Sequence, residues 1–195
     1  MELPCKYSEK GCEYLGPRGA MKDHLDICSY GKIECQYLRC RKMVLRKELV
    51  THLKGHHDAV KEWPADEFGR IKNFNWKMSL EIFNETVQVW WRPQLTQFEG
   101  RTFILQGLAQ DFSWKFWVTL LGDEDEANTF EVKMDAFRVG SPLNISLRGK
   151  IYSTDTKKKD VLSDGKGILE LSHNQVRMLG KIDDSCDINY QIIRK

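Results

Sequence analysis

Hydrophobic and polar residues alternate with a period of two along much of the chain after Asn73. The apolar members of four such runs are Phe112, Trp114, Phe116, Val118 and Leu120; Phe130, Val132, Met134 and Ala136; Leu143, Ile145 and Leu147; and Ile188, Tyr190 and Ile192. Successive side chains of a strand point to opposite faces of a sheet, so each run predicts a strand with one buried face and one face in water.

Turn signals separate these runs, at Gly100, at Gly122-Asp123-Glu124-Asp125 and at Ser163-Asp164-Gly165. Seven or eight short strands in roughly 120 residues, without intervening helical patterns, predict a mainly β protein with an antiparallel sandwich over residues 73–195. We expect the stretch 153–167, which contains three consecutive lysines, to be a long solvated hairpin tip.

Aromatic residues fall on both faces of two predicted strands. Alternation buries Trp91, Trp114 and Phe116, and it leaves Trp90 and Trp117 facing outward. Tryptophans are enriched at interfaces, so these two are candidate contacts for a protein partner. The alternative is that another part of the chain covers these two side chains.

Residues 1–57 have a different pattern, which repeats once. Short helices are predicted over residues 19–28 and 46–54, and Leu25 and Leu53 occupy equivalent places in them. Residues 58–72 are mixed and polar, with Pro64 and Gly69, and we expect them to form a connector.

Each copy of the repeat carries four potential metal ligands. The first copy has the spacing C-x6-C-x11-H-x3-C, and the second has C-x4-C-x11-H followed by two candidate histidines. The residues are Cys5, Cys12, His24 and Cys28 in the first copy, and Cys35, Cys40, His52 and then His56 or His57 in the second. Structural zinc sites use four thiolate or imidazole ligands in a tetrahedron, so the repeat predicts two structural zinc ions.

The last ligand of the second site is open between two neighbours. His56 lies at i+4 from His52, which suits a helix, and His57 lies at i+5, which suits a helix that ends near Gly55. We favour His57, because glycine is common where a helix ends. Four protein ligands leave no position for an activated water, which argues against metal catalysis.

Composition narrows the class of protein. The 195 residues suffice for one ordinary domain plus a small appendage. The net charge of +2 is too small to indicate an overall electrostatic attraction to nucleic acid or membranes. We find no apolar run of about 18 residues and no secretory signal. Five of the six cysteines lie in the first 40 residues at metal spacing, so we expect a reducing, cytoplasmic setting.

DNA binding and catalysis both agree poorly with the sequence. Fingers that read DNA come in tandem with basic helix faces, whereas here the second finger is basic and the first carries several acids. For catalysis, the candidates are a lone His173 and Cys186, whose acidic neighbours would raise a thiol pKa. We therefore expect no catalytic centre in this chain.

The ligand pattern followed by a sandwich resembles the seven in absentia family and, more broadly, TRAF-type zinc-finger proteins. Residues 5–28 are similar to the first finger of that family, and residues 35–57 to the second, although the C-x4-C gap is shorter than usual. The stretches 116–122, 128–134 and 187–192 are similar to strands of its substrate-binding domain.

In that family, an amino-terminal RING recruits a ubiquitin-conjugating enzyme, while the fingers and the TRAF-like sandwich bind substrates or adaptors and dimerise. The resemblance therefore implies the substrate- or adaptor-binding module of a RING-type E3 ubiquitin ligase, without the RING. It would bind peptide segments of protein partners by adding a strand to a sheet edge. The alternatives are a signalling scaffold with no link to ubiquitin and, less favoured, a nucleic-acid-binding finger protein.

Overall fold

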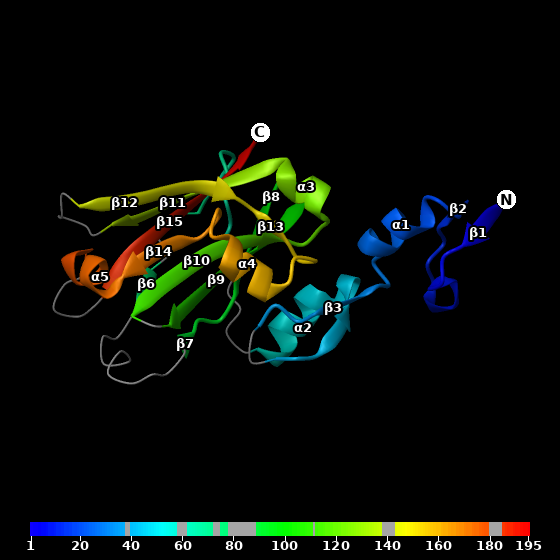
Figure 1. Cartoon of the computed structure of the whole chain (residues 1–195), viewed down its shortest axis with the longest axis horizontal. Helices are drawn as coiled ribbons and strands as arrows, with labels where there is room; N and C mark the ends of the chain where they lie inside the picture. The colour runs from blue at the N-terminus through cyan, green and yellow to red at the C-terminus, as the bar shows by residue number, and fades with distance from the viewer. Residues whose placement is uncertain are drawn as a thin grey trace. The chain divides into compact units, whose positions relative to one another are not determined.

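The structure is a computed structural model that describes residues 1–37, 40–57, 62–71, 75–77, 89–110, 112–137, 143–179 and 185–195. Its contacts divide the chain into two compact units, Met1–Val60 and Lys61–Lys195 (Figure 1). Within the described residues, no helix is long and apolar enough to cross a bilayer.

The first unit consists of two successive copies of a hairpin followed by a helix. In the first copy, β1 (Glu2–Pro4) pairs with β2 (Leu15–Pro17), with η1 (Ser8–Lys10) between them and α1 (Met21–Ile27) after them. In the second, β3 (Lys32–Glu34) pairs with β4 (Met43–Leu45), and η2 (Arg46–Glu48) leads into α2 (Leu49–His56). Both predicted helices are confirmed, although the first turn of the second is a 3-10 helix.

Apolar burial in the first unit is uneven between the two copies. Ile33, Leu49 and Leu53 are buried in the second copy, whereas α1 has no buried residue and Leu25 is half-buried. A chain segment this short cannot bury enough apolar surface to fold by itself. The first copy in particular must therefore draw its stability from its Cys/His cluster.

In its described residues the second unit is mainly β and has two sheets, as the alternation predicts. In the part of the chain that the structure describes, the first sheet has six strands with the path β13-β10-β9-β7, to which β14 adds on β10 and β8 on β9. Its strands are β7 (Val89–Trp90), β8 (Gln94–Phe98), β9 (Arg101–Gln110), β10 (Ser113–Leu120), β13 (Tyr152–Ser153) and β14 (Leu169–Ser172). All its pairs are antiparallel except β10 with β13.

The second sheet has five strands among the described residues, and all of their pairs are antiparallel. Its path is β12-β11-β15-β5, and β6 also pairs with β15. The strands are β5 (Arg70–Ile71), β6 (Asn75–Lys77), β11 (Phe130–Phe137), β12 (Asn144–Lys150) and β15 (Ser185–Arg194). Arg70 and Ile71, within the expected connector, thus pair with β15 in this sheet.

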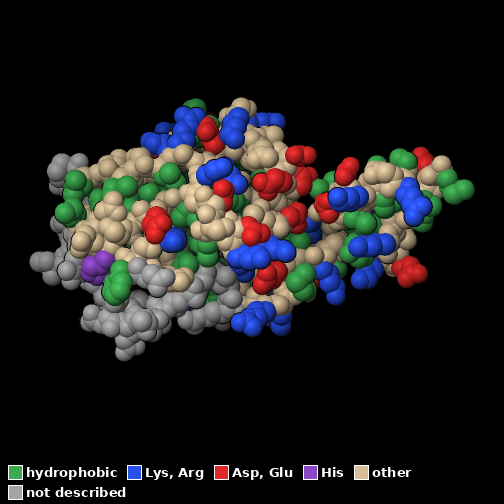
Figure 2. Space-filling model, viewed as in Figure 1, with side chains coloured by type: hydrophobic (Ala, Val, Ile, Leu, Met, Phe, Trp, Pro, Cys, Tyr) green, Lys and Arg blue, Asp and Glu red, His purple; other side chains and the backbone are tan. Residues whose placement is uncertain are grey.

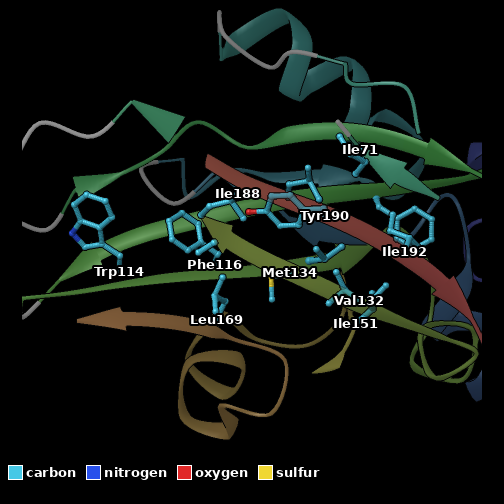
Figure 3. Close-up of a cluster of buried hydrophobic side chains, with 14 of the residues drawn as sticks. Ile71, Trp114, Phe116, Val132, Met134, Ile151, Leu169, Ile188, Tyr190 and Ile192 are labelled. Carbon is cyan, nitrogen blue, oxygen red and sulfur yellow. The ribbon is translucent and has the colours of Figure 1, made fainter. Parts of the chain in front are cut away.

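The apolar faces of the two sheets share one core, shown in Figure 3. Trp114 and Phe116 come from β10, Val132 and Met134 from β11, and Tyr190 from β15, and all are at most 1% exposed. These are positions that the period of two assigns to the buried face, so the predicted sandwich core is confirmed at them.

The number of strands to compare with the prediction depends on the shortest strand that is counted. Among the described residues, the strands of four residues or more are β8, β9, β10, β11, β12, β14 and β15, which agrees with the expected seven or eight. The remaining strands of this unit have two or three residues, too few to produce a periodic signal.

Within the described residues, the second unit also has three short helices that the sequence pattern does not predict: α3 (Glu124–Asn128), α4 (Lys158–Asp164) and α5 (His173–Leu179). The expectation of a solvated hairpin tip at 153–167 is wrong, because α4 occupies it and buries Val161. A helix of seven residues spans barely two turns, so its apolar residues show no clear helical period.

Two aromatic assignments are also wrong. Phe112 is 69% exposed with a φ of 59°, because it lies in the turn before β10 and not in the strand. Trp117, expected to face outward, is 1% exposed. The reason is that β9 and β10 are covered on both faces: seven consecutive residues of β9, from 103 to 109, are buried. The side chain of Trp90 lies outside the described residues.

Candidate metal centres

The first cluster joins the ends of a hairpin to one helix. Cys5 follows β1, Cys12 precedes β2, His24 lies on α1, and Cys28 follows the last residue of that helix. All four ligand atoms lie within 4.8 Å of one another. Cys12 Sγ is 3.4 Å from His24 Nε2 and 3.6 Å from Cys28 Sγ, and the Sγ atoms of Cys5 and Cys28 are 3.9 Å apart.

The second cluster is built in the same way from the second hairpin and helix. Cys35 Sγ is 3.4 Å from His57 Nε2, and Cys40 Sγ is 3.5 Å from His52 Nε2. The four ligand atoms again lie within 4.8 Å of one another. The structure therefore brings His57 into the cluster, immediately after α2, whereas His56 is exposed at the end of the helix.

A tyrosine that the spacing analysis missed shapes the first Cys knuckle. The backbone N–H of Tyr7 donates to Cys5 Sγ at 3.4 Å, and the carbonyl of Tyr7 accepts from the N–H of Cys12 at 3.2 Å. The first contact gives the sulfur of Cys5 a backbone hydrogen-bond donor.

The second knuckle has the same two contacts. The N–H of Tyr37 donates to Cys35 Sγ at 3.4 Å, and the carbonyl of Tyr37 accepts from the N–H of Cys40 at 2.9 Å. Both knuckles keep this geometry although their Cys intervals differ by two residues. A tyrosine two positions after the first cysteine of each finger was the signal in the sequence that could have revealed it.

Hydrogen bonding, burial and nearby charges shift the pKa of three of the proposed ligands. A hydrogen bond from the backbone N–H of Tyr14 lowers the pKa of Cys12, whereas burial raises the pKa of Cys28. Burial, together with the nearby His56 and Lys42, lowers the pKa of His52. His52 is therefore held as a neutral imidazole at neutral pH, which is the form that binds a metal ion.

Both donor sets fit zinc. Zn–S bonds of about 2.3 Å in a tetrahedron place two sulfurs about 3.8 Å apart. The sulfur separations of 3.6 and 3.9 Å in the first cluster match this spacing. The chain thus has two Cys/His clusters that could hold zinc, one with three thiols and one imidazole and one with two of each.

Comparison with known proteins agrees with this geometry. A family model described as "Sina, zinc finger" matches residues 1–68, a stretch that contains both clusters. Residues 1–68 are thus similar to the zinc-finger region of the seven in absentia family. The resemblance predicted for the fingers is confirmed for this region.

A curated relative is more distant. The human protein named E3 ubiquitin-protein ligase PDZRN3 is 24% identical over 59 residues, which cover 30% of this chain. The same stretch covers 6% of that protein, so the chain corresponds to a small part of the relative's length.

Two basic residues of the second finger hold the two fingers together. Arg46 Nη2 donates to the carbonyl of Asp26 at 2.6 Å, and Lys47 Nζ lies 3.8 Å from the centroid of the Tyr30 ring.

On the face of the molecule seen in Figure 2, basic and acidic side chains are interspersed. Neither observation favours a nucleic-acid surface, which requires clustered, available cations.

Proposed function

We propose that this chain is a non-catalytic, substrate- or adaptor-binding region associated with an E3 ubiquitin ligase. The observation that carries the proposal is the match to the Sina zinc finger over residues 1–68, on the same stretch that holds both four-donor clusters. The distant similarity to a human protein named as an E3 ubiquitin ligase supports the same association.

In this proposal, each cluster binds one structural zinc ion. The ligands are Cys5, Cys12, His24 and Cys28 for the first ion, and Cys35, Cys40, His52 and His57 for the second. Four protein donors complete the tetrahedron, so the ion supplies folding free energy to a unit with little apolar core. No coordination position remains for a substrate or water, and the chain contributes binding instead of catalysis.

The sandwich is the proposed site for peptide segments of partners. In the described part of the second unit, β12 pairs on one side only, with β11, and its residues are mostly exposed or half-exposed. A partner segment can add to such an edge through backbone hydrogen bonds, with side-chain contacts for specificity. Trp117 is not part of this proposed surface, because its side chain is buried.

The proposal is tested by asking whether ubiquitin transfer accompanies the chain. The tagged full chain is recovered from cells and supplied with ubiquitin-activating enzyme, a ubiquitin-conjugating enzyme, ATP and ubiquitin. We expect conjugates to form in this precipitate, and none to form with recombinant chain purified alone. A variant with Cys5→Ser and Cys35→Ser, which cannot complete either zinc site, serves as the control and should recover less activity.

Each contrary result has a specific meaning. Conjugates made by the recombinant chain alone would contradict the non-catalytic assignment. Partners recovered without any ubiquitin transfer would favour the alternative, a signalling scaffold in the cytoplasm with no link to ubiquitin.

Homodimerisation is proposed from the same family resemblance. The chain has a mass of 22.8 kDa, so sedimentation equilibrium should report about twice that value if the sandwich dimerises. A concentration-independent monomer would contradict this part of the proposal.

A further inference from the structure

One proposed ligand of the first cluster, His24, lies flat against an aromatic ring. The ring centroids of Tyr14 and His24 are 3.7 Å apart, and the ring planes differ by 5°. Tyr14 belongs to the hairpin, immediately before β2, whereas His24 lies on α1, so the stack joins the two elements that carry the ligands. The phenol ring therefore shields one face of the imidazole from water.

The Tyr14 ring also lies against Gly16. A Cβ at position 16 would be 2.5 Å from Tyr14 Oη and 2.7 Å from its Cζ, which is closer than packed atoms approach. Gly16 is buried and does not have a positive φ, so the backbone does not require glycine there. Its missing side chain instead leaves the space that the Tyr14 ring fills.

The other aromatic neighbours of the clusters are arranged differently. The ring of Tyr37 lies 4.5 Å from that of His57 and is tilted by 40°. In the first knuckle, Tyr7 has Lys6 and Lys10 near its ring, at 5.0 and 5.5 Å from the centroid. The coplanar contact between Tyr14 and His24 is therefore specific to the first cluster among these three tyrosines.

We propose that Tyr14 is a positioning residue for the metal of the first cluster, a role that rests on the proposed ligation of zinc by His24. A ring stacked at 3.7 Å prevents the imidazole from rotating about its bond to the chain. Nε2 of His24 is thereby kept 3.4 Å from Cys12 Sγ, as a shared metal requires. Groups that orient a ligand histidine from outside the coordination sphere typically change metal affinity by about 10- to 100-fold.

The test compares the full chain with Tyr14→Leu and Tyr14→Phe. Both substitutions keep the backbone contacts of residue 14 with the first knuckle, and the phenylalanine also keeps a ring to stack. Each protein is loaded with cadmium-113, whose NMR signal distinguishes a three-thiolate site from a two-thiolate site. Competition with a chelator then gives the affinity of each site separately, and the second site is the internal reference.

We expect Tyr14→Leu to weaken the first site about tenfold and to leave the second unchanged, while Tyr14→Phe restores wild-type affinity. Gly16→Ala should weaken the first site similarly by displacing the ring. In the Tyr14→Leu background it should add little, because the ring it displaces is gone.

The contrary outcomes separate this proposal from the one on which it rests. If wild type binds two ions and Tyr14→Leu retains full affinity at the first site, the positioning role is wrong. Equal weakening of both sites would also overturn it, since that indicates a general effect on folding. If the wild-type chain binds no metal at either site, zinc ligation itself is refuted.

Discussion

Neighbouring residues of one type can have unequal roles, and the two histidines after Gly55 are an example. His57 Nε2 lies 3.4 Å from Cys35 Sγ, whereas His56 is exposed and only its ring lies near His52, at 4.9 Å. The helix ends at His56, and the turn away from helical geometry at His57 directs that side chain to the cluster.

This difference predicts unequal effects of two matched substitutions. His57→Ala should reduce bound zinc from two ions to one, because the second cluster loses a ligand, and His56→Ala should leave two ions bound. Native mass spectrometry of the full chain after dialysis against a weak chelator measures the stoichiometry. Loss of an ion in His56→Ala but not in His57→Ala would reverse the ligand assignment.

A buried polar pair in the second unit gives another prediction for single residues. Gln106 Nε2 donates to Thr119 Oγ1 at 2.7 Å, and both residues are less than 5% exposed. Gln106→Leu or Thr119→Val alone should lower the free energy of unfolding by about 1–3 kcal/mol, because each leaves a buried polar group without its partner. The double variant should lose less free energy of unfolding than the sum of the losses of the two single variants.

Urea unfolding of all four proteins, followed by tryptophan fluorescence, completes this double-mutant cycle. Strictly additive losses would contradict the prediction, since they would show that the two side chains do not depend on each other.

At the scale of elements, helix α4 is held to the sheet by a network around one tyrosine. Tyr152 Oη accepts from the N–H of Gly167 at 3.1 Å and donates to Asp164 Oδ2 at 3.3 Å. Lys150 Nζ lies 2.8 Å from the same Asp164 oxygen and lowers the pKa of that carboxyl group. Burial, assisted by the charge of Asp164, raises the pKa of Tyr152 to about 12.

The raised pKa gives this network a defined pH dependence. An unfolded tyrosine has a pKa of about 10, so above that pH the unfolded chain loses a proton that the folded chain retains. The contribution of Tyr152 is therefore complete below pH 10 and should decline by about 2 kcal/mol as the pH rises from about 10 to 12.

Tyr152→Phe is the variant that isolates this effect. Near neutral pH it should be less stable than wild type, because it loses two hydrogen bonds, and the gap should narrow between pH 10 and 12. Urea unfolding monitored by near-ultraviolet circular dichroism at several pH values measures the gap. A gap that stays constant over this range would show that the hydroxyl of Tyr152 titrates normally.

At the scale of the whole molecule, the two units differ in what stabilises them. The sandwich has a large apolar core drawn from both of its sheets, whereas the fingers have few buried apolar side chains apart from their cysteines. Removal of zinc should therefore unfold the first unit and leave the second folded.

A strong chelator added to the full chain tests this prediction. We expect limited proteolysis to cleave residues 1–57 rapidly while a β-rich fragment beginning near residue 61 survives, and excess zinc should prevent the cleavage. Unfolding of the sandwich at the same chelator concentration would show instead that its stability depends on the metal.

The sequence by itself determined the features that depend on neighbours along the chain. The ligand spacing from Cys5 to His52 gave seven of the eight clustered residues without ambiguity, and the period of two gave the core positions of β10, β11 and β15. Spacing and periodicity have this power because a knuckle, a helical turn and a pleated strand each fix side-chain directions within a few residues.

Only the tertiary structure decided what depends on distant segments. It buried Trp117 on the second face of β10, formed α4 where a solvated loop was expected, brought His57 into the second cluster, and stacked Tyr14 on His24. Each of these results needs a partner from another part of the chain, and a local pattern contains no information on which segment will supply it.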